Sequence, residues 1–296
     1  MEFFNLNNEN RLPKICFGPG IPFRGMKSRS GIYKIIDKIK RIKQLKTYES
    51  AIVSALGIEN VFIDYSASYG REDLIASAIK KAGVKRENIF LTTRVSNKSQ
   101  FNNNVRETAL RSIERFGTSY VDLLMFHWPV TDKYITTWEE IIRLKEEGYC
   151  KNIGVANCHQ HHIEELIKST SVKPQVNQIE VHPLFSQKPL IEYCQSQEIQ
   201  VEAYTPLARM DERLVRLPLR KNLQKKYNKS ISQLVLRWHI QNGIIPVFRS
   251  MNPSRIKENL DIFDFEIDNE DMLLIDGINI NSRLRYDPDN CDFTIL

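Results

Sequence analysis

Short apolar segments rich in β-branched residues alternate along this chain with longer segments in which apolar residues recur every three or four positions. The first pattern is typical of buried strands and the second of helices with one packed face. Eight segments have the character of strands, at residues 15–18, 61–65, 89–93, 121–126, 152–155, 176–180, 201–204 and 244–247. Helical spacing occupies seven segments between them, at residues 48–56, 71–82, 103–116, 136–147, 161–169, 188–197 and 232–241.

This alternation predicts an α/β fold with parallel strands. In the 103–116 segment, Val105, Ala109, Ile113 and Phe116 form the stripe expected of a helix packed on a sheet. Eight strands followed by helices fit a single (β/α)8 TIM barrel over residues 1–296, with the active site at the C-terminal face of the barrel. An open doubly wound sheet is the rival architecture, and the number of strands and the length of the chain favour closure.

Composition narrows the functional class. Apolar residues make up 42% and charged residues 26%, which suits a globular protein and excludes disordered, collagen-like and disulfide-scaffold classes. The net charge of +6 is locally balanced and gives no reason to expect a nucleic-acid partner. The five cysteines contain no Cys-x-x-Cys pair, and no apolar run is long enough to cross a membrane. We therefore expect a cytoplasmic protein with no membrane partner, and its oligomeric state stays open.

Two segments depart from a minimal barrel. Residues 26–46 are strongly basic but keep isoleucines at helical spacing, which favours a helix with a solvated basic face over a patch for an anionic partner. The tail at residues 281–296 is polar and aromatic, and tails of this kind often fold back over a barrel mouth.

Three motif-like sequences point to known sites but do not fit them. The glycines of residues 18–25 do not form a phosphate-binding loop, because Met26 separates Gly25 from Lys27. They do not form a dinucleotide fingerprint either, because Phe23 stands where its third glycine belongs. Residues 158–162, Cys-His-Gln-His-His, offer metal-binding side chains, but no second Cys/His cluster completes a ligand set. The start of a helix explains them adequately, so we expect no metal site.

The chemistry concentrates where barrel strands end. Polar side chains expected at the C-terminal ends of successive strands are Asp64, Tyr69, Arg94, His127, Asn157, Gln178, Tyr204, Arg249, Ser250 and Arg255. Individually, Tyr69 could be a turn residue, His127 a core-edge histidine and Asp64 a cap. Their joint placement favours an acid–base site rather than a metal cage.

These segments carry a family resemblance. Residues 61–72, Val-Phe-Ile-Asp-Tyr-Ser-Ala-Ser-Tyr-Gly-Arg-Glu, resemble the aldo-keto reductase signature, in which an Asp is followed five residues later by the catalytic Tyr. Residues 123–129, Leu-Leu-Met-Phe-His-Trp-Pro, resemble the family segment that ends in the catalytic His. Segments 151–157, 178–183 and 204–207 are similar to its nicotinamide-binding strand ends, and 249–260 to its adenosine-phosphate clamp. The matches run in family order from about residue 12 to residue 276.

The resemblance implies an NADPH-dependent oxidoreductase that reduces an aldehyde, ketone or sugar carbonyl to the alcohol. Tyr69 would be the general acid, His127 would orient the carbonyl, and Asp64 would hold the neighbouring cation. The implied cofactor-binding residues are Gly20, Asn157, Gln178, Tyr204, Arg249, Ser250, Arg255, Glu258 and Asn259. Two guanidinium groups and a hydroxyl near a helix start suit the 2′-phosphate of NADPH. Trp128, together with Tyr286, is a candidate to line the pocket of a small carbonyl substrate.

One position departs from the family pattern. The catalytic cation of the family is a Lys, and Arg94 stands in its place. A unit charge about 4 Å from a phenol contributes about 4 kcal/mol at an effective dielectric of ~20, so Arg94 can supply most of the field. Its planar group is less compact than an ammonium, so we expect a slower or re-tuned reductase. The alternatives are an NADPH-binding regulatory or catalytically impaired barrel, and a barrel of unrelated chemistry such as an isomerase.

Overall fold

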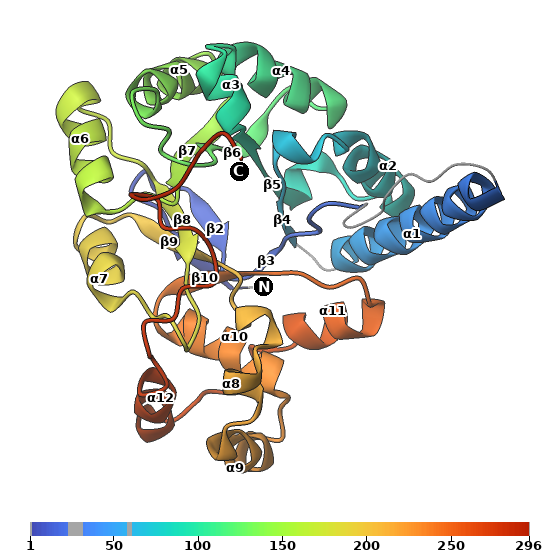
Figure 1. The fold of residues 1–296 in the computed structure, drawn as a ribbon, viewed down its shortest axis with the longest axis vertical. Coiled ribbons are helices and arrows are strands. Elements are labelled where there is room, and N and C mark those ends of the chain that lie inside the picture. The colour runs from blue at the N-terminus through green and yellow to red at the C-terminus, as the bar shows by residue number, and fades with distance from the viewer. Residues whose placement is uncertain (1, 23–31, 58–60, 296) are drawn as a thin grey trace.

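A computed structural model describes residues 2–22, 32–57 and 61–295, and its centre is a closed barrel of eight parallel strands (Figure 1). The strands follow the order β10-β3-β4-β5-β6-β7-β8-β9 around the barrel. Their bounds are β3 Cys16–Phe17, β4 Val61–Asp64, β5 Ile89–Val95, β6 Val121–Phe126, β7 Cys150–Ala156, β8 Val176–Glu180, β9 Gln200–Tyr204 and β10 Ile244–Phe248. Each coincides with one of the eight predicted strands to within a few residues, so the predicted barrel is confirmed and the open sheet is excluded.

Helices surround the strands. Their bounds are α1 Ile32–Leu56, α2 Glu72–Ala82, α3 Asn97–Phe101, α4 Val105–Arg115, α5 Tyr134–Glu146, α6 Gln160–Thr170, α7 Lys188–Ser196, α8 Glu212–Val215, α9 Pro218–Tyr227, α10 Ile231–Gln241, α11 Pro253–Leu260 and α12 Asn269–Asp276. The predicted stripe of α4 is confirmed, since Val105, Ala109, Ile113 and Phe116 are all buried. These side chains belong to the main hydrophobic core, which lies between helices and strands. No helix among the described residues is both long and apolar enough to cross a membrane.

A second core fills the inside of the barrel. An antiparallel hairpin of β1 (Phe3–Asn5) and β2 (Arg11–Pro13) precedes the first barrel strand and lies behind the barrel in Figure 1. Its Leu6 and Leu12 are buried in one cluster with Phe62, Leu123 and other inward-facing side chains. The hairpin therefore closes one end of the barrel and leaves the opposite end, where the strands finish, for the site.

The structure differs from the sequence-based expectation in two connections. The predicted helix at 48–56 is the end of a longer α1, which projects from the barrel in Figure 1. Ile39 and Ile42 are 62% and 46% exposed, so the apolar row of the basic segment is not packed into the core there. Residues 26–31 of that segment lie outside the described residues. The connection after β9, for which no helix was predicted before residue 232, contains α8 and α9.

Candidate active site

A buried ion pair lies at the centre of the barrel mouth. Asp64 is the last residue of β4, and Arg94 lies near the end of the adjacent β5, so parallel pairing brings the two side chains together. Arg94 Nη2 donates to Asp64 Oδ2 at 2.6 Å, and both residues are about 5% exposed. Burial disfavours the charge of the guanidinium, but the acidic groups around it, Asp64 first among them, together outweigh this effect and raise the pKa of Arg94 above its ordinary value. Arg94 is therefore a fixed cation at the site.

Gln178 connects this ion pair to a second buried acid. Its Oε1 accepts a hydrogen bond from Arg94, and its Nε2 donates to Glu202 Oε2 at 2.7 Å and to Asp64 Oδ1 at 3.3 Å. Burial, and then the charge of Asp64, raise the pKa of Glu202 to about 8. Glu202 was not among the predicted site residues, although an acid at the middle of a buried strand is a signal that could have identified it.

Tyr69 lies in a tight turn just beyond β4. It ends the 3-10 helix Ala67–Tyr69, which begins where Ser66 Oγ accepts from the backbone N–H of Ser68, and Gly70 closes the turn with a φ of 67°. The half-buried Tyr69 ring meets the Tyr65 ring edge-on, with their centroids 5.2 Å apart. Tyr69 and Arg94 are close enough to interact electrostatically. The phenol of Tyr69 and the buried cation therefore belong to the neighbouring ends of β4 and β5.

His127 follows β6 on the neighbouring side of the mouth. Burial, with a further contribution from Arg94, lowers the pKa of His127 to about 3. The imidazole is therefore neutral at physiological pH and can donate one hydrogen bond from its ring N–H.

Hydrogen bonds connect polar groups from three further strands next to His127. Asn157 has a φ of 60°, and its Nδ2 donates to the His127 carbonyl oxygen at 2.9 Å. Tyr204 Oη donates to Asn157 Oδ1 at 2.7 Å, and the Asn157 backbone N–H donates to the Gln178 carbonyl at 2.9 Å. Six of the predicted residues, Asp64, Arg94, His127, Asn157, Gln178 and Tyr204, therefore form one connected group.

The remaining predicted cofactor residues gather around the loop after β10. The Arg249 side chain lies against Gly20, whose φ is 67°, and a Cβ added there would be 2.9 Å from Arg249 Nε. Arg249 Nε donates to the Pro19 carbonyl at 3.0 Å, which joins this loop to the end of β3. Ser250 accepts from the backbone of Asn252, the residue that caps α11. Along α11, Arg255 and Glu258 are exposed and Asn259 is buried.

The C-terminal tail crosses the mouth, as Figure 1 shows in red. The backbone N–H groups of Leu284 and Arg285 donate to the Glu180 carboxylate at 2.7 and 3.0 Å. Further along, Phe293 packs on Trp128 with ring centroids 6.4 Å apart, which leaves Trp128 only 4% exposed. Tyr286, the other aromatic candidate, is 46% exposed.

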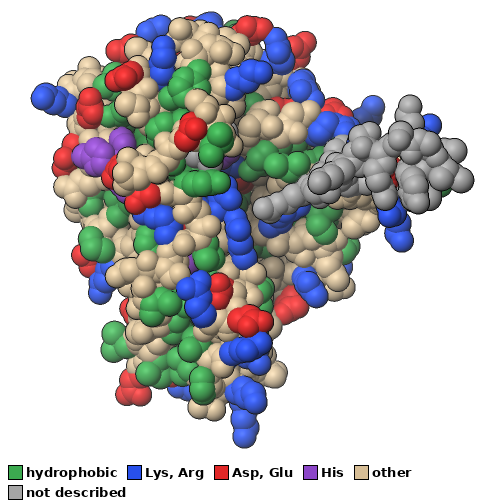
Figure 2. Space-filling view, in the orientation of Figure 1, with side chains coloured by type: hydrophobic (Ala, Val, Ile, Leu, Met, Phe, Trp, Pro, Cys, Tyr) green, Lys and Arg blue, Asp and Glu red, His purple; other side chains and the backbone are tan. Residues whose placement is uncertain are grey.

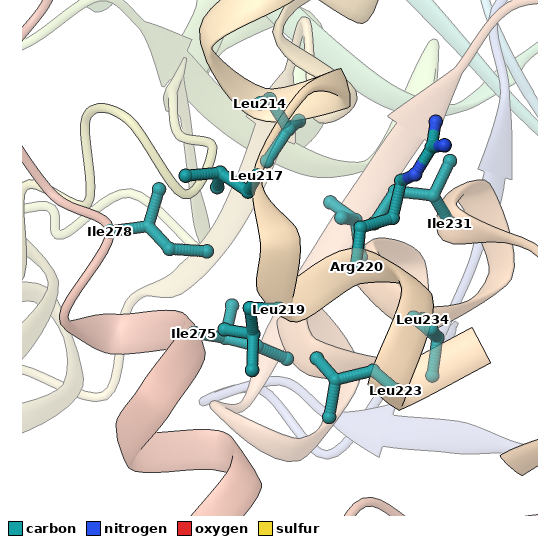
Figure 3. A pocket seen from close by; sticks show the side chains of 10 residues that line it. Leu214, Leu217, Leu219, Arg220, Leu223, Ile231, Leu234, Ile275 and Ile278 are labelled. Atoms are coloured by element: carbon teal, nitrogen blue, oxygen red, sulfur yellow. The ribbon is translucent and has the colours of Figure 1, made fainter. Parts of the chain in front are cut away.

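An apolar hollow lies elsewhere in the molecule, between α9, α10 and α12 (Figure 3). It is lined by side chains such as Leu217, Leu223 and Ile275 and has a volume of about 10 Å³. A space of this size holds at most one water molecule, so it does not compete with the mouth as a substrate site.

Comparison with known proteins agrees with this geometry. The model of the aldo/keto reductase family matches residues 30–280. The glyoxal reductase of Bacillus subtilis is 41% identical over 78% of this chain and 83% of its own length. The methylglyoxal reductase DkgA of Escherichia coli O157:H7 is 38% identical over 81% of this chain and 87% of its own. A crystal structure of a Bombyx mori aldo-keto reductase in complex with NADP superimposes with a TM-score of 0.83 at 30% identity, covering 97% of this chain and 96% of that one. The chain therefore belongs to the aldo/keto reductase family, whose oxidoreductases reduce carbonyl groups with a nicotinamide cofactor.

Proposed function

We propose that this protein is an NADPH-dependent reductase of small aldehydes and ketones, with α-oxoaldehydes such as glyoxal and methylglyoxal as the first substrates to test. The observation that carries the proposal is the buried Arg94–Asp64 pair at the barrel mouth, with Tyr69 and a neutral His127 at the neighbouring ends of β4 and β6. The two relatives that reduce glyoxal and methylglyoxal support the choice of substrate class.

Each side chain has a defined task in this reaction. Tyr69 donates its proton to the carbonyl oxygen, and the positive charge of Arg94 stabilises the tyrosinate that remains. His127 stays neutral and donates a hydrogen bond to the same oxygen, which fixes the orientation of the carbonyl. Asp64 holds the guanidinium in place. NADPH, when bound, supplies the hydride.

The residues present fit this cofactor. The close approach of Arg249 to Gly20 keeps a guanidinium next to the backbone at the β3 end of the barrel. Arg255 is exposed on the first turn of α11 and has no ion-pair partner among the described residues. Two cations and the Ser250 hydroxyl near one helix start suit a phosphate dianion, which is why we expect NADPH to bind more tightly than NADH. Asn157 and Gln178 carry the amides suited to a carboxamide, and Tyr204 the ring suited to stacking.

The test is a carbonyl screen with Tyr69→Phe as the matched control, since this change removes one oxygen and keeps the ring. We expect wild-type protein to oxidise NADPH in the presence of glyoxal or methylglyoxal, and Tyr69→Phe to lose activity by about 100-fold or more, the size typical of general acid catalysis. Absorbance of NADPH measures the rate, and quenching of tryptophan fluorescence measures binding. Equal rates in both proteins would refute the role of Tyr69.

The same experiment addresses the alternative of a catalytically impaired barrel. That alternative is favoured by the direction of the Arg94 hydrogen bonds, since Nη1 and Nη2 donate to Gln178 and Asp64 and not to Tyr69. Binding of NADPH without turnover of any carbonyl would establish it.

A further inference from the structure

Three histidines at the start of α6 surround one carboxylate from the C-terminal tail. His159 Nδ1 lies 2.7 Å from Asp289 Oδ2, whereas His161 Nε2 and His162 Nε2 lie 3.3 and 3.6 Å from Asp289 Oδ1. Figure 2 shows histidine side chains grouped on the surface at this edge of the molecule, next to acidic side chains. The sequence argued against a metal here because no second cluster was visible, and the fold supplies the missing group from 127 residues beyond His162.

Three of these side chains have the geometry of metal ligands. One ligand atom each from His159, His161 and Asp289 lies within 4.8 Å of the other two. Ligand atoms about 2.0–2.1 Å from a tetrahedral zinc ion lie about 3.3 Å apart. The three side chains therefore need to move only slightly closer together to coordinate one ion. The His161 side chain is 60% exposed and is free to make that movement. Open coordination positions would be taken by water.

His162 has a different part in the cluster. Its Nδ1 accepts a hydrogen bond from the His159 backbone N–H at 3.1 Å, so the ring proton of the neutral imidazole lies on Nε2, facing Asp289. An N–H group cannot coordinate a metal. His162 is therefore suited to hold the Asp289 carboxylate in position, as outer partners of metal ligands commonly do.

The position of the carboxylate is fixed by its own turn. Asp287 Oδ1 accepts from the Asp289 backbone N–H at 3.0 Å, and the Asp287 carbonyl accepts from the Asn290 N–H at 3.1 Å. Two positive features oppose a cation here, namely the N-terminal end of α6 and the Arg283 guanidinium, 3.5 Å from His159 Nε2. The negative charge of Asp289, and that of Asp287 3.9 Å from Arg283, offset them.

We propose that His159, His161 and Asp289 form a binding site for a divalent transition-metal ion of the Zn²⁺ class, and that the bound ion pins the C-terminal tail to α6. Imidazole and carboxylate together favour zinc and its neighbours over magnesium. Because the same tail packs on Trp128 and Glu180, occupancy of this site would hold it across the barrel mouth.

Calorimetric titration of the full-length protein with zinc chloride tests the proposal. We expect one equivalent of zinc to bind and no heat of binding with magnesium chloride. His161→Ala and Asp289→Asn should each weaken zinc binding by about tenfold or more, since loss of a ligand costs at least as much as loss of an outer partner. Asp292→Asn is the matched control, because it makes the same change of charge on an exposed tail residue outside the cluster and should bind zinc like wild type.

Limited digestion with trypsin tests the effect on the tail. Zinc should slow cleavage after Arg283 and Arg285 in the wild-type protein and have no such effect in Asp289→Asn. Cys291→Ser should keep full zinc binding, because the thiol is not part of the proposed ligand set. Absence of zinc binding to wild type, unchanged binding by Asp289→Asn, or loss of binding in Cys291→Ser would each overturn the proposal.

Discussion

At the scale of single residues, Arg94 decides how this site differs from its family. A lysine ammonium is compact and can approach a phenol from one side, whereas the planar guanidinium of Arg94 is spread between Asp64 and Gln178. The charge is retained, but part of it is directed away from Tyr69. In the proposed reaction, Arg94 would therefore stabilise the tyrosinate less effectively than a lysine.

Arg94→Lys is the direct test of that interpretation. We expect a severalfold rise in kcat, equivalent to about 1 kcal/mol of transition-state stabilisation, because the ammonium can concentrate its charge near the phenol. Arg94→Met, which removes the charge, should be far slower than wild type. Steady-state rates with NADPH and one aldehyde measure both changes, and a fall in rate for Arg94→Lys would show that the guanidinium is the better group in this protein.

The raised pKa of Glu202 makes the stability of the folded protein depend on pH. An unfolded glutamate has a pKa of about 4.3, while burial raises the pKa of Glu202 to about 8 in the folded protein. Between these values the folded protein keeps a proton that the unfolded chain has released, so the free energy of unfolding falls as pH rises. Glu202→Gln should lack the decrease in the free energy of unfolding that Glu202 causes, and it should be more stable than the wild-type protein at about pH 8.5. Melting temperatures across this range measure it, with the exposed Glu192→Gln as a control that should follow wild type.

At the scale of elements, the hydrophobic pattern of the sequence predicted all eight barrel strands. Parallel strands covered on both faces read as continuous apolar runs, which is why segments such as 121–126 and 176–180 were predicted at their observed bounds. The hairpin of β1 and β2 was not predicted, because each strand has only three residues. Its buried side chains pack against the barrel interior, and no local sequence pattern shows that contact. The Asp289 contact with α6 was likewise invisible, since no local pattern links residues so far apart in the chain.

The hairpin makes a measurable contribution to stability. Leu12 is fully buried against the barrel-interior cluster, so Leu12→Ala leaves a cavity and should lower the free energy of unfolding by about 2–5 kcal/mol. Urea denaturation measures the change. The half-buried Phe3→Ala is a control on the same hairpin, and a loss there as large as that of Leu12→Ala would contradict the assignment of Leu12 to the inner core.

At the scale of the whole molecule, the site is completed by segments from both halves of the chain. Strands β4 to β6 and the turns after them carry Tyr69, Arg94 and His127. The tail covers Trp128 through Phe293, which is 165 residues further along. If the mouth binds the carbonyl substrate as proposed, one wall of the pocket depends on the position of the tail and not on the barrel alone.

Phe293→Ala separates the tail's effect on substrate binding from the chemistry. Removing the ring takes away the aromatic side chain that packs on Trp128. The proposed wall of the substrate pocket should then loosen, and KM for the carbonyl substrate should rise severalfold. The binding of NADPH should not change, because Phe293 contacts Trp128 and the Asn97 side chain, and neither is a proposed cofactor residue. The value of kcat should change little, because Tyr69 and Arg94 lie outside these contacts. Ile295→Ala, two residues away and 69% exposed, is the matched control and should leave all three quantities unchanged. A fall in kcat with KM unchanged would mean that Phe293 supports the reacting groups and not the wall of the substrate pocket.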